Sequence, residues 1–143
     1  MREAGRDPAN FDVVLRVPIA VDEPREVVRE LARRMLTGYA IVPTYAATLG
    51  RQGYGSAAEA AIEAWNAGNR QRAVSLLPDE IVDAFFVHGN ASDCRARLAA
   101  YRDAGVRTLV LMHLSVGSTP EERGERIAGQ LEALAPSRAT DSK

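Results

Sequence analysis

The sequence predicts an α/β fold with a parallel sheet. Residues 85–113, FFVHGNASDCRARLAAYRDAGVRTLVLMH, have the pattern of a strand, a turn, a helix and a second strand. A connection of this length between two strands implies a right-handed parallel crossover. An earlier strand and a final helix, at residues 11–21 and 119–134, extend the same alternation in both directions along the chain.

The first 84 residues predict one strand followed by several helices. The run FDVVLRVPIAV (11–21) is rich in β-branched residues, and Pro18 makes the strand irregular or places it at an edge. A helix follows from Pro24 to Gly38, with apolar residues at helical spacing. Further helices are expected after Pro43, from the capping-box pair Ser56 and Glu59 to Gly68, over 70–76, and after Pro78.

The remaining residues predict two strands, each followed by a helix. A short buried strand is expected over 85–88, and Asn90 with Asp93 should cap a helix that ends at Gly105. The run 106–112 is almost entirely apolar from Leu109 onward, which is typical of a strand covered on both faces. Thr119, Pro120 and Glu122 form a helix start, and residues 137–143 are expected to be a disordered tail.

The number of strands points to part of a larger fold. A complete (β/α)8 barrel needs about 250 residues and eight strands, whereas this chain has 143 residues. The first residues, MREAGRDP, resemble the end of a helix, because glycine and then proline follow a charged segment. Three parallel strands with helices could form a small open layer, whose exposed sheet edges would allow self-association or a homodimer. We therefore expect residues 1–136 to be the C-terminal part of something larger, and of a (β/α)8 barrel the chain could supply only the last three or so strand–helix units.

Composition excludes several other classes of protein. The net charge of −1 lacks the basic excess of a nucleic-acid binder. No apolar run reaches the roughly 20 residues of a membrane helix, and the polar N-terminus lacks a signal-peptide core. The single cysteine, Cys94, cannot form an intramolecular disulfide and is expected to be an inert core residue. We expect a cytoplasmic protein without nucleic-acid or membrane partners.

Two long segments resemble luciferase-like monooxygenases. They are GRDPANFDVVLRVPIAVDEPREVVRELA and YGSAAEAAIEAWNAGNRQRAVSLLPDEIVDAFFVHGNASDCRARLAAYRDAGVRTLVL. The resemblance covers roughly residues 2–134 and is to the C-terminal half of that family. At Asn90 the sequence departs from relatives, which often carry Thr or Ser followed by Pro.

The resemblance implies an oxidoreductase built on a TIM barrel that uses FMN or the deazaflavin F420 on a small-molecule substrate. It also implies that much of the cofactor cradle comes from earlier strands, so this segment alone should be inactive and unlikely to hold the cofactor. The alternative is a standalone small α/β module that dimerises through its sheet edge and binds a partner or small ligand.

The candidate cofactor-binding residues are His88, Gly89, Asn90 and His113. Both histidines end predicted parallel strands, and the C-terminal strand ends of such barrels form the active site. An imidazole there could hydrogen-bond a flavin or a substrate, or it could be a rim residue with ordinary partners. Gly89 and Asn90 precede a helix whose free N–H groups could bind an anion, although an ordinary capped turn is the simpler interpretation. The sequence identifies no catalytic residue, and two histidines without spaced carboxylates do not predict a metal site.

Overall fold

The computed structural model describes residues 11–135, and this part of the chain divides into two units. Unit 1 comprises residues 11–23 and 87–135, and unit 2 comprises residues 24–86. The predicted helix end in residues 1–10, the boundary at 136 and the predicted tail at 137–143 lie outside the described residues.

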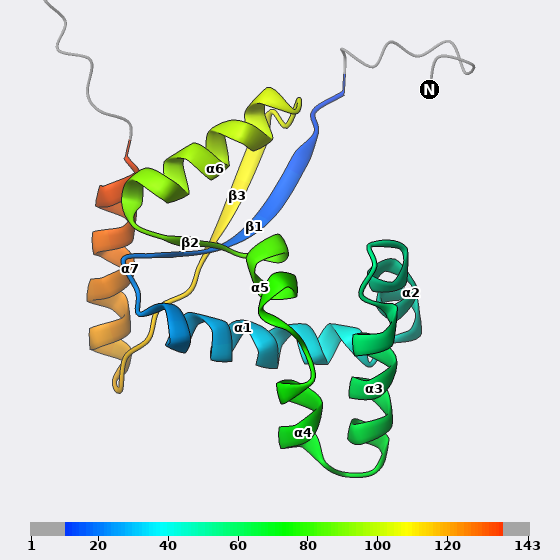
Figure 1. Cartoon of the computed structure of the whole chain (residues 1–143). Coiled ribbons are helices and arrows are strands. Elements are labelled where there is room, and N and C mark those ends of the chain that lie inside the picture. Colours follow the sequence, from blue (N-terminus) through cyan, green and yellow to red (C-terminus); the bar gives the residue numbers. More distant parts are fainter. Residues whose placement is uncertain (1–10, 136–143) are drawn as a thin grey trace, which may run out of the picture. The chain divides into compact units, whose positions relative to one another are not determined.

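Unit 1 is an open parallel sheet with two helices. The sheet order is β2-β1-β3, and both pairings are parallel (Figure 1). These observations confirm the α/β class and the parallel sheet. The elements are β1 (Val14–Val21), β2 (Val87–Gly89), α6 (Ala91–Asp103), β3 (Thr108–His113) and α7 (Pro120–Leu134).

The strand order places β1 in the middle of the sheet. Around a barrel, each strand pairs with the strand that follows it in the chain, so β3 would lie beside β2. Here the chain passes from β2 through α6 to the opposite edge of β1, where β3 pairs over Val14↔Thr108 to Ile19↔His113. The sheet is therefore not closed, and β2 and β3 lie on opposite sides of β1.

One face of the sheet is covered by both helices of unit 1. Side chains alternate between the two faces of a strand, and Val17, Ile19 and Val21 on one face of β1 form the buried core of the unit. Residues of both helices pack against this core, including Leu98 of α6 and Leu134 of α7.

The opposite face is more open, which corrects one prediction. The segment 106–112 was expected to be covered on both faces, but Val110 is 48% exposed. Val110 pairs with Arg16, and Val14, on the same face of β1 as Arg16, is 56% exposed. The reason is that α6 and α7 pack on the same side of the sheet. The apolar run in this strand therefore does not mean that both faces of the strand are buried.

Helix starts in unit 1 follow the capping chemistry of the sequence. The Asn90 side chain accepts a hydrogen bond from the Asp93 backbone N–H at 2.9 Å, and Thr119 accepts one from the Glu122 N–H at 3.2 Å. The strand predicted over 85–88 is shifted, because Phe85 ends the preceding helix and β2 begins at Val87.

Unit 2 contains five helices in its described residues: α1 (Arg25–Ala40), α2 (Pro43–Arg51), α3 (Gly55–Asn66), α4 (Arg70–Ser75) and α5 (Asp79–Phe85) (Figure 1). The predicted capping box is wrong, because α3 begins at Gly55 and its N-cap residue, Tyr54, makes no side-chain cap. The helix predicted to end at Gly38 continues to Ala40.

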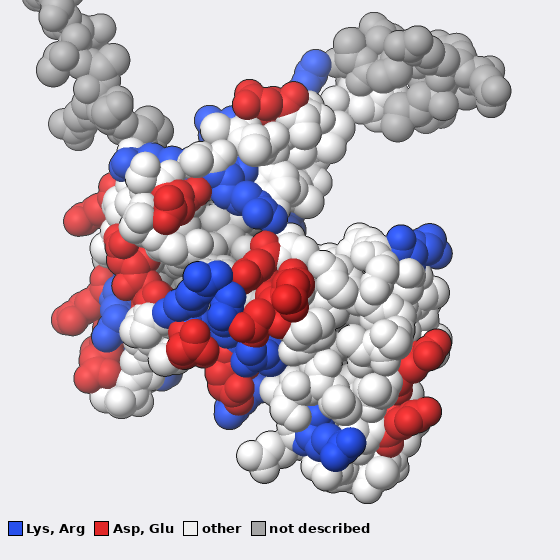
Figure 2. Space-filling view, in the orientation of Figure 1, with Lys and Arg blue, Asp and Glu red and all other residues white. Residues whose placement is uncertain are grey.

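An ion-pair network joins α1 to α5 within unit 2. The Arg29 guanidinium lies 2.6 Å from an Asp79 carboxylate oxygen and 3.1 Å from one of Asp83. Arg25 also pairs with Asp83, and Arg33 with Asp79. Burial alone lowers the pKa of Arg29, but the hydrogen bond and charge of Asp83, with the charges of Asp79 and Glu26, raise it overall. Figure 2 shows acidic and basic side chains interleaved on the face that it presents.

Candidate functional site

The two histidines flank the same stretch of β1 but point to opposite faces of the sheet. His88 pairs with Ala20, and His113 pairs with Ile19. Because Ile19 and Ala20 are successive residues, their side chains and those of their partners point in opposite directions. His113 therefore shares the helix-covered face, and His88 shares the more open face with Val110.

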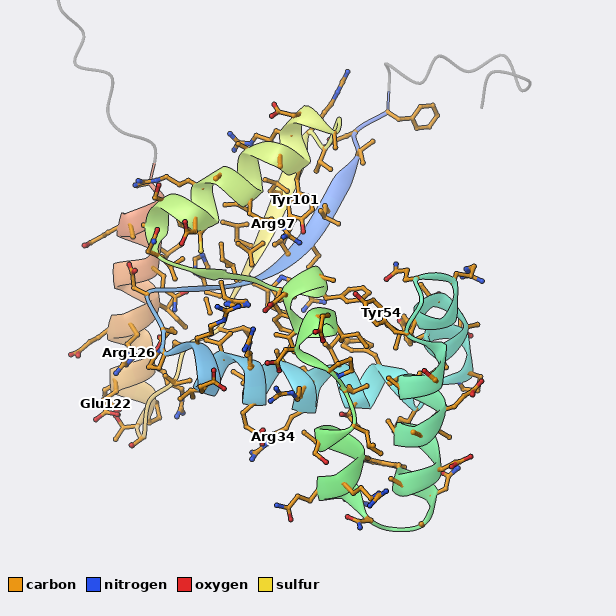
Figure 3. All side chains as sticks on the ribbon, viewed as in Figure 1. Arg34, Tyr54, Arg97, Tyr101, Glu122 and Arg126 are labelled. Carbon is orange, nitrogen blue, oxygen red and sulfur yellow. The ribbon has the colours of Figure 1, made fainter. Side chains whose placement is uncertain are left out.

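A chain of hydrogen bonds joins His113 to a carboxylate that follows β1. His113 Nδ1 lies 3.0 Å from Gln130 Oε1, and Gln130 Nε2 donates to Glu23 Oε1 at 3.3 Å. Arg126 donates to the other oxygen of Glu23 at 3.1 Å. The Glu23 side chain is 2% exposed and the Arg126 side chain 49% exposed, so a buried carboxylate is neutralised by an arginine that reaches solvent. Figure 3 labels Arg126 on α7.

These contacts fix the proton position on His113. Gln130 Nε2 also donates to the Leu114 carbonyl at 2.8 Å. With two acceptors on one side of the amide, its nitrogen must face them and its oxygen must face the histidine. His113 Nδ1 is then a donor, and in the neutral ring Nε2 keeps its lone pair. That Nε2 atom is buried and has no hydrogen-bond partner among the described residues.

The loop after β1 has an unusual backbone. Asp22 has φ of 56°, the only positive φ of a non-glycine residue in the part of the chain that the structure describes. Asp is one of the few residues that adopt this region at modest cost. The Asp22 N–H donates to the Gly89 carbonyl at 2.8 Å, which extends the contact between the ends of β1 and β2.

A crevice of about 250 Å³ lies beside this loop. Its walls come from the end of β1 with the loop that follows it, and from α7. The lining residues are Val21, Asp22, Glu23, Arg126, Gly129 and Gln130.

Gly89 and Asn90 form a capped turn at the start of α6. Gly89 has φ of 130°, and a Cβ at this position would lie 3.3 Å from an Asp93 carboxylate oxygen. Asn90 already accepts the Asp93 N–H, and Asp93 adds a negative charge to the first turn. The prediction that these residues contact a cofactor stays a prediction. The hydrogen bond from the Asp93 N–H to Asn90 is that of an ordinary capped turn, the simpler alternative.

Cys94 is buried on the first turn of α6, at 0% exposure. Burial, followed by the charges of Asp22 and Asp93, raises the pKa of its thiol to about 11. The thiol is therefore protonated near neutral pH, as the prediction of an inert core cysteine requires. The described residues contain no group of three or more histidine, cysteine or acidic side chains placed to bind a metal ion.

Comparisons with known proteins identify the family. The family model described as "Luciferase-like monooxygenase" matches residues 1–108. The chain belongs to the luciferase-like monooxygenase family. It is similar to a curated protein named "5,10-methylenetetrahydromethanopterin reductase" from Methanolobus tindarius, with 28% identity over 111 residues, which is 76% of this chain. The matched part spans 34% of that relative, and no solved structure matches the chain.

The crevice beside Glu23 in this luciferase-like chain is too small for a flavin-sized ligand. Pockets for drug-sized ligands measure about 300–1,000 Å³, and the crevice beside Glu23 is smaller than that range. The open face that carries His88 has no second wall from α6 or α7. No helix between residues 11 and 135 has both the length and the apolar character needed to cross a membrane.

The sequence of this luciferase-like segment singled out the two histidines, and their functional role stays a prediction; it did not single out the residues that contact His113. Glu23, Arg126 and Gln130 carry no motif, because they come together only when α7 packs beside the loop after β1. One available signal was position: Glu23 comes two residues after the strand, where barrels place functional groups. Arg16 on the open face was also overlooked, and its guanidinium lies 2.8 Å from the Met112 sulfur.

Proposed function

We propose that the chain supplies C-terminal strand–helix units of a luciferase-like oxidoreductase that uses FMN or F420 on a small-molecule substrate. The observation that carries the proposal is the family membership together with an open parallel sheet whose helices cover one face. In a (β/α)8 barrel the helices form the outer ring, and the opposite face of the strands lines the interior. The matched curated relative is about three times longer than the matched segment, which supports a partial barrel.

The alternation of side chains divides the candidate residues between the two sides of such a barrel. His88, Arg16 and Met112 lie on the face that would line the interior. His113 lies on the helix side, where Gln130 binds it. Among the four candidate cofactor-binding residues, His88 is therefore favoured for direct contact with a cofactor, and His113 for a positioning role.

The cofactor supplies the electron-transfer chemistry in this family, and the protein supplies binding and orientation. The described residues provide one wall of that environment. We therefore expect the isolated chain to show no turnover and weak or no cofactor binding, and we assign no chemical step to its residues.

The proposal is tested by supplying the missing walls. The chain is expressed with the part of the 5,10-methylenetetrahydromethanopterin reductase relative that lies outside the matched segment, and F420 or FMN binding is followed by fluorescence. We expect binding only in the combined sample. His88→Gln should weaken it about tenfold, the effect of losing one hydrogen bond to a charged or polar group, whereas His113→Gln, at the positioning residue, should weaken it less. A chain that is purified alone with bound FMN, or two variants that behave identically, would contradict the proposal.

The second candidate is a standalone α/β module that dimerises through its sheet edge. The order β2-β1-β3 favours it, because this order is that of an open sheet and not of consecutive barrel strands. Unpaired strand edges favour association with another chain. Size-exclusion chromatography with light scattering separates the two candidates: a discrete dimer that binds no flavin supports the module, and an aggregating chain rescued by the partner segment supports the barrel.

A further inference from the structure

The sheet face of unit 1 that α6 and α7 leave open has an exposed apolar centre. Val14 of β1 and Val110 of β3 are both about half exposed. They share this face, because Val110 pairs with Arg16, which lies two residues after Val14. Parallel sheets are normally covered on both faces, so a second protein surface is expected to cover this one.

A base lies on one side of the apolar centre. The exposed Arg16 guanidinium makes one hydrogen bond among the described residues, to the Met112 sulfur at 2.8 Å. A thioether is a weak acceptor, whereas a guanidinium has five N–H donors. Arg16 therefore keeps most of its capacity to bind a carboxylate.

An acid lies on the other side of the apolar centre. Asp12 comes two residues before Val14, and its carboxylate accepts a hydrogen bond from the Thr108 hydroxyl at 2.8 Å. Thr108 pairs with Val14, so this bond holds the carboxylate at the same face of the sheet. Asp12 and Arg16 are about 13 Å apart along the strand, too far for an ion pair within one chain. The order acid, apolar, base is symmetric in spacing about Val14.

We propose that the open faces of two copies of this chain pack against each other about a two-fold axis that passes at Val14. The axis lies between the two sheets and perpendicular to the strands, so the strands of the two copies run in opposite directions. Val14 then faces the partner's Val14, and Arg16 of each copy faces the partner's Asp12. One rotation makes both ion pairs, which is the self-complementarity that a two-fold interface requires.

Charge selects this orientation of the two sheets. With the strands of both copies in the same direction, Arg16 would face a second Arg16 and Asp12 a second Asp12, and such like-charge contacts are unfavourable. Facing sheets pack about 10 Å apart, a gap that an extended arginine opposite an aspartate can bridge. The dimer uses the sheet face, unlike the sheet-edge module above. It concerns the chain by itself and does not rest on the proposed oxidoreductase function, in which this face would line a barrel.

The test is the oligomeric state of the complete 143-residue chain, measured by sedimentation velocity over a range of concentrations. We expect a monomer–dimer equilibrium. Arg16→Glu should raise its dissociation constant about tenfold, because the symmetry converts two ion pairs into two repulsive contacts. Asp12→Arg should act in the same direction, and the double variant Arg16→Glu/Asp12→Arg should restore dimerisation. The matched control is Arg102→Glu on α6, which makes the same change in net charge on the helix-covered side of the sheet and should leave the constant unchanged.

Each other outcome overturns the proposal. A chain that is monomeric at every concentration has no such interface. A dimer that the single variants leave unchanged is formed by another surface, such as the strand edges. A double variant that dimerises no better than the single variants shows that Arg16 and Asp12 do not face each other. Cofactor binding is not part of these measurements, so their failure is distinct from a failure of the proposed function.

Discussion

Replacing Gln130 by leucine tests whether the hydrogen bonds behind His113 stabilise unit 1. Gln130 is 3% exposed, and leucine has a similar size and helix propensity. Gln130→Leu leaves the Leu114 carbonyl and the His113 Nδ1–H without their amide partner, and it removes one of the two bonds to Glu23.

The expected magnitude follows from these three contacts. Each buried group left without a partner costs about 1–3 kcal/mol, and the bond to Glu23, at 3.3 Å, is the longest and weakest of the three. The added apolar burial of leucine offsets about 1 kcal/mol. We expect a loss of about 2–4 kcal/mol in the free energy of unfolding of unit 1.

The measurement must report on unit 1, because the single tryptophan, Trp65, lies in α3 of unit 2. Hydrogen exchange of the β1 and β3 amides in increasing urea gives the required local stability. The matched control is Gln71→Leu on the exposed surface of α4, which should change stability by less than about 0.5 kcal/mol. Equal effects of the two substitutions would show that the hydrogen-bond chain contributes little.

Three other predictions concern single side chains. The pKa of the Cys94 thiol is raised to about 11 in the folded chain, so the thiol ionises at lower pH in the unfolded chain. Its contribution to the free energy of unfolding is therefore fully present below about pH 9 and is lost as pH rises to about 11. The rate of thiol modification, followed as a function of pH and urea, measures this loss of stability. Arg29→Met should destabilise unit 2, because it removes the ion pairs with Asp79 and Asp83, and Trp65 fluorescence measures this, whereas the exposed control Arg34→Met should cost less than about 0.5 kcal/mol. Asp22→Val should cost about 1–2 kcal/mol at its positive φ, and Asp22→Gly should not, as judged by exchange of the β1 amides.

The local elements were predictable because their signals are local. Asn90 and Thr119 start helices through bonds to residues three positions later, so the pattern is visible within a short window. Phe85 was assigned to a strand because apolar residues surround it, whereas the structure places it at the end of α5. Short apolar runs do not distinguish a helix end from a strand start.

The contacts around His113 could not be predicted from the sequence, since the residues involved meet through tertiary packing. The histidines were found from a rule about strand ends, but the rule does not specify which face a side chain occupies. That depends on register, and pairing of Ile19 with His113 and Ala20 with His88 separates the two rings. Glu23 and Gln130 are 107 residues apart and are joined by a hydrogen bond that no spacing pattern reports.

Strand order is the feature on which the two proposed functions differ, and a cross-link tests it directly. Arg16 of β1 pairs with Val110 of β3, and both side chains lie on the open face. Neighbouring strands are about 4.8 Å apart, within the range of about 4.4–6.8 Å between the Cα atoms of a disulfide. In a barrel with consecutive strands, β2 would separate β1 from β3, and the distance would be about 9.6 Å.

Oxidation of the double variant Arg16→Cys/Val110→Cys should therefore give an intramolecular disulfide in the chain alone. The control Arg16→Cys/Leu109→Cys should not react, because Leu109 pairs with Leu15 and points to the opposite face, and Cys94 does not compete because it is buried. If the cross-link is lost when the unmatched part of the 5,10-methylenetetrahydromethanopterin reductase relative is present, β3 has moved from the edge of β1, as a barrel requires. If the cross-link fails in the chain alone, the order β2-β1-β3 is wrong.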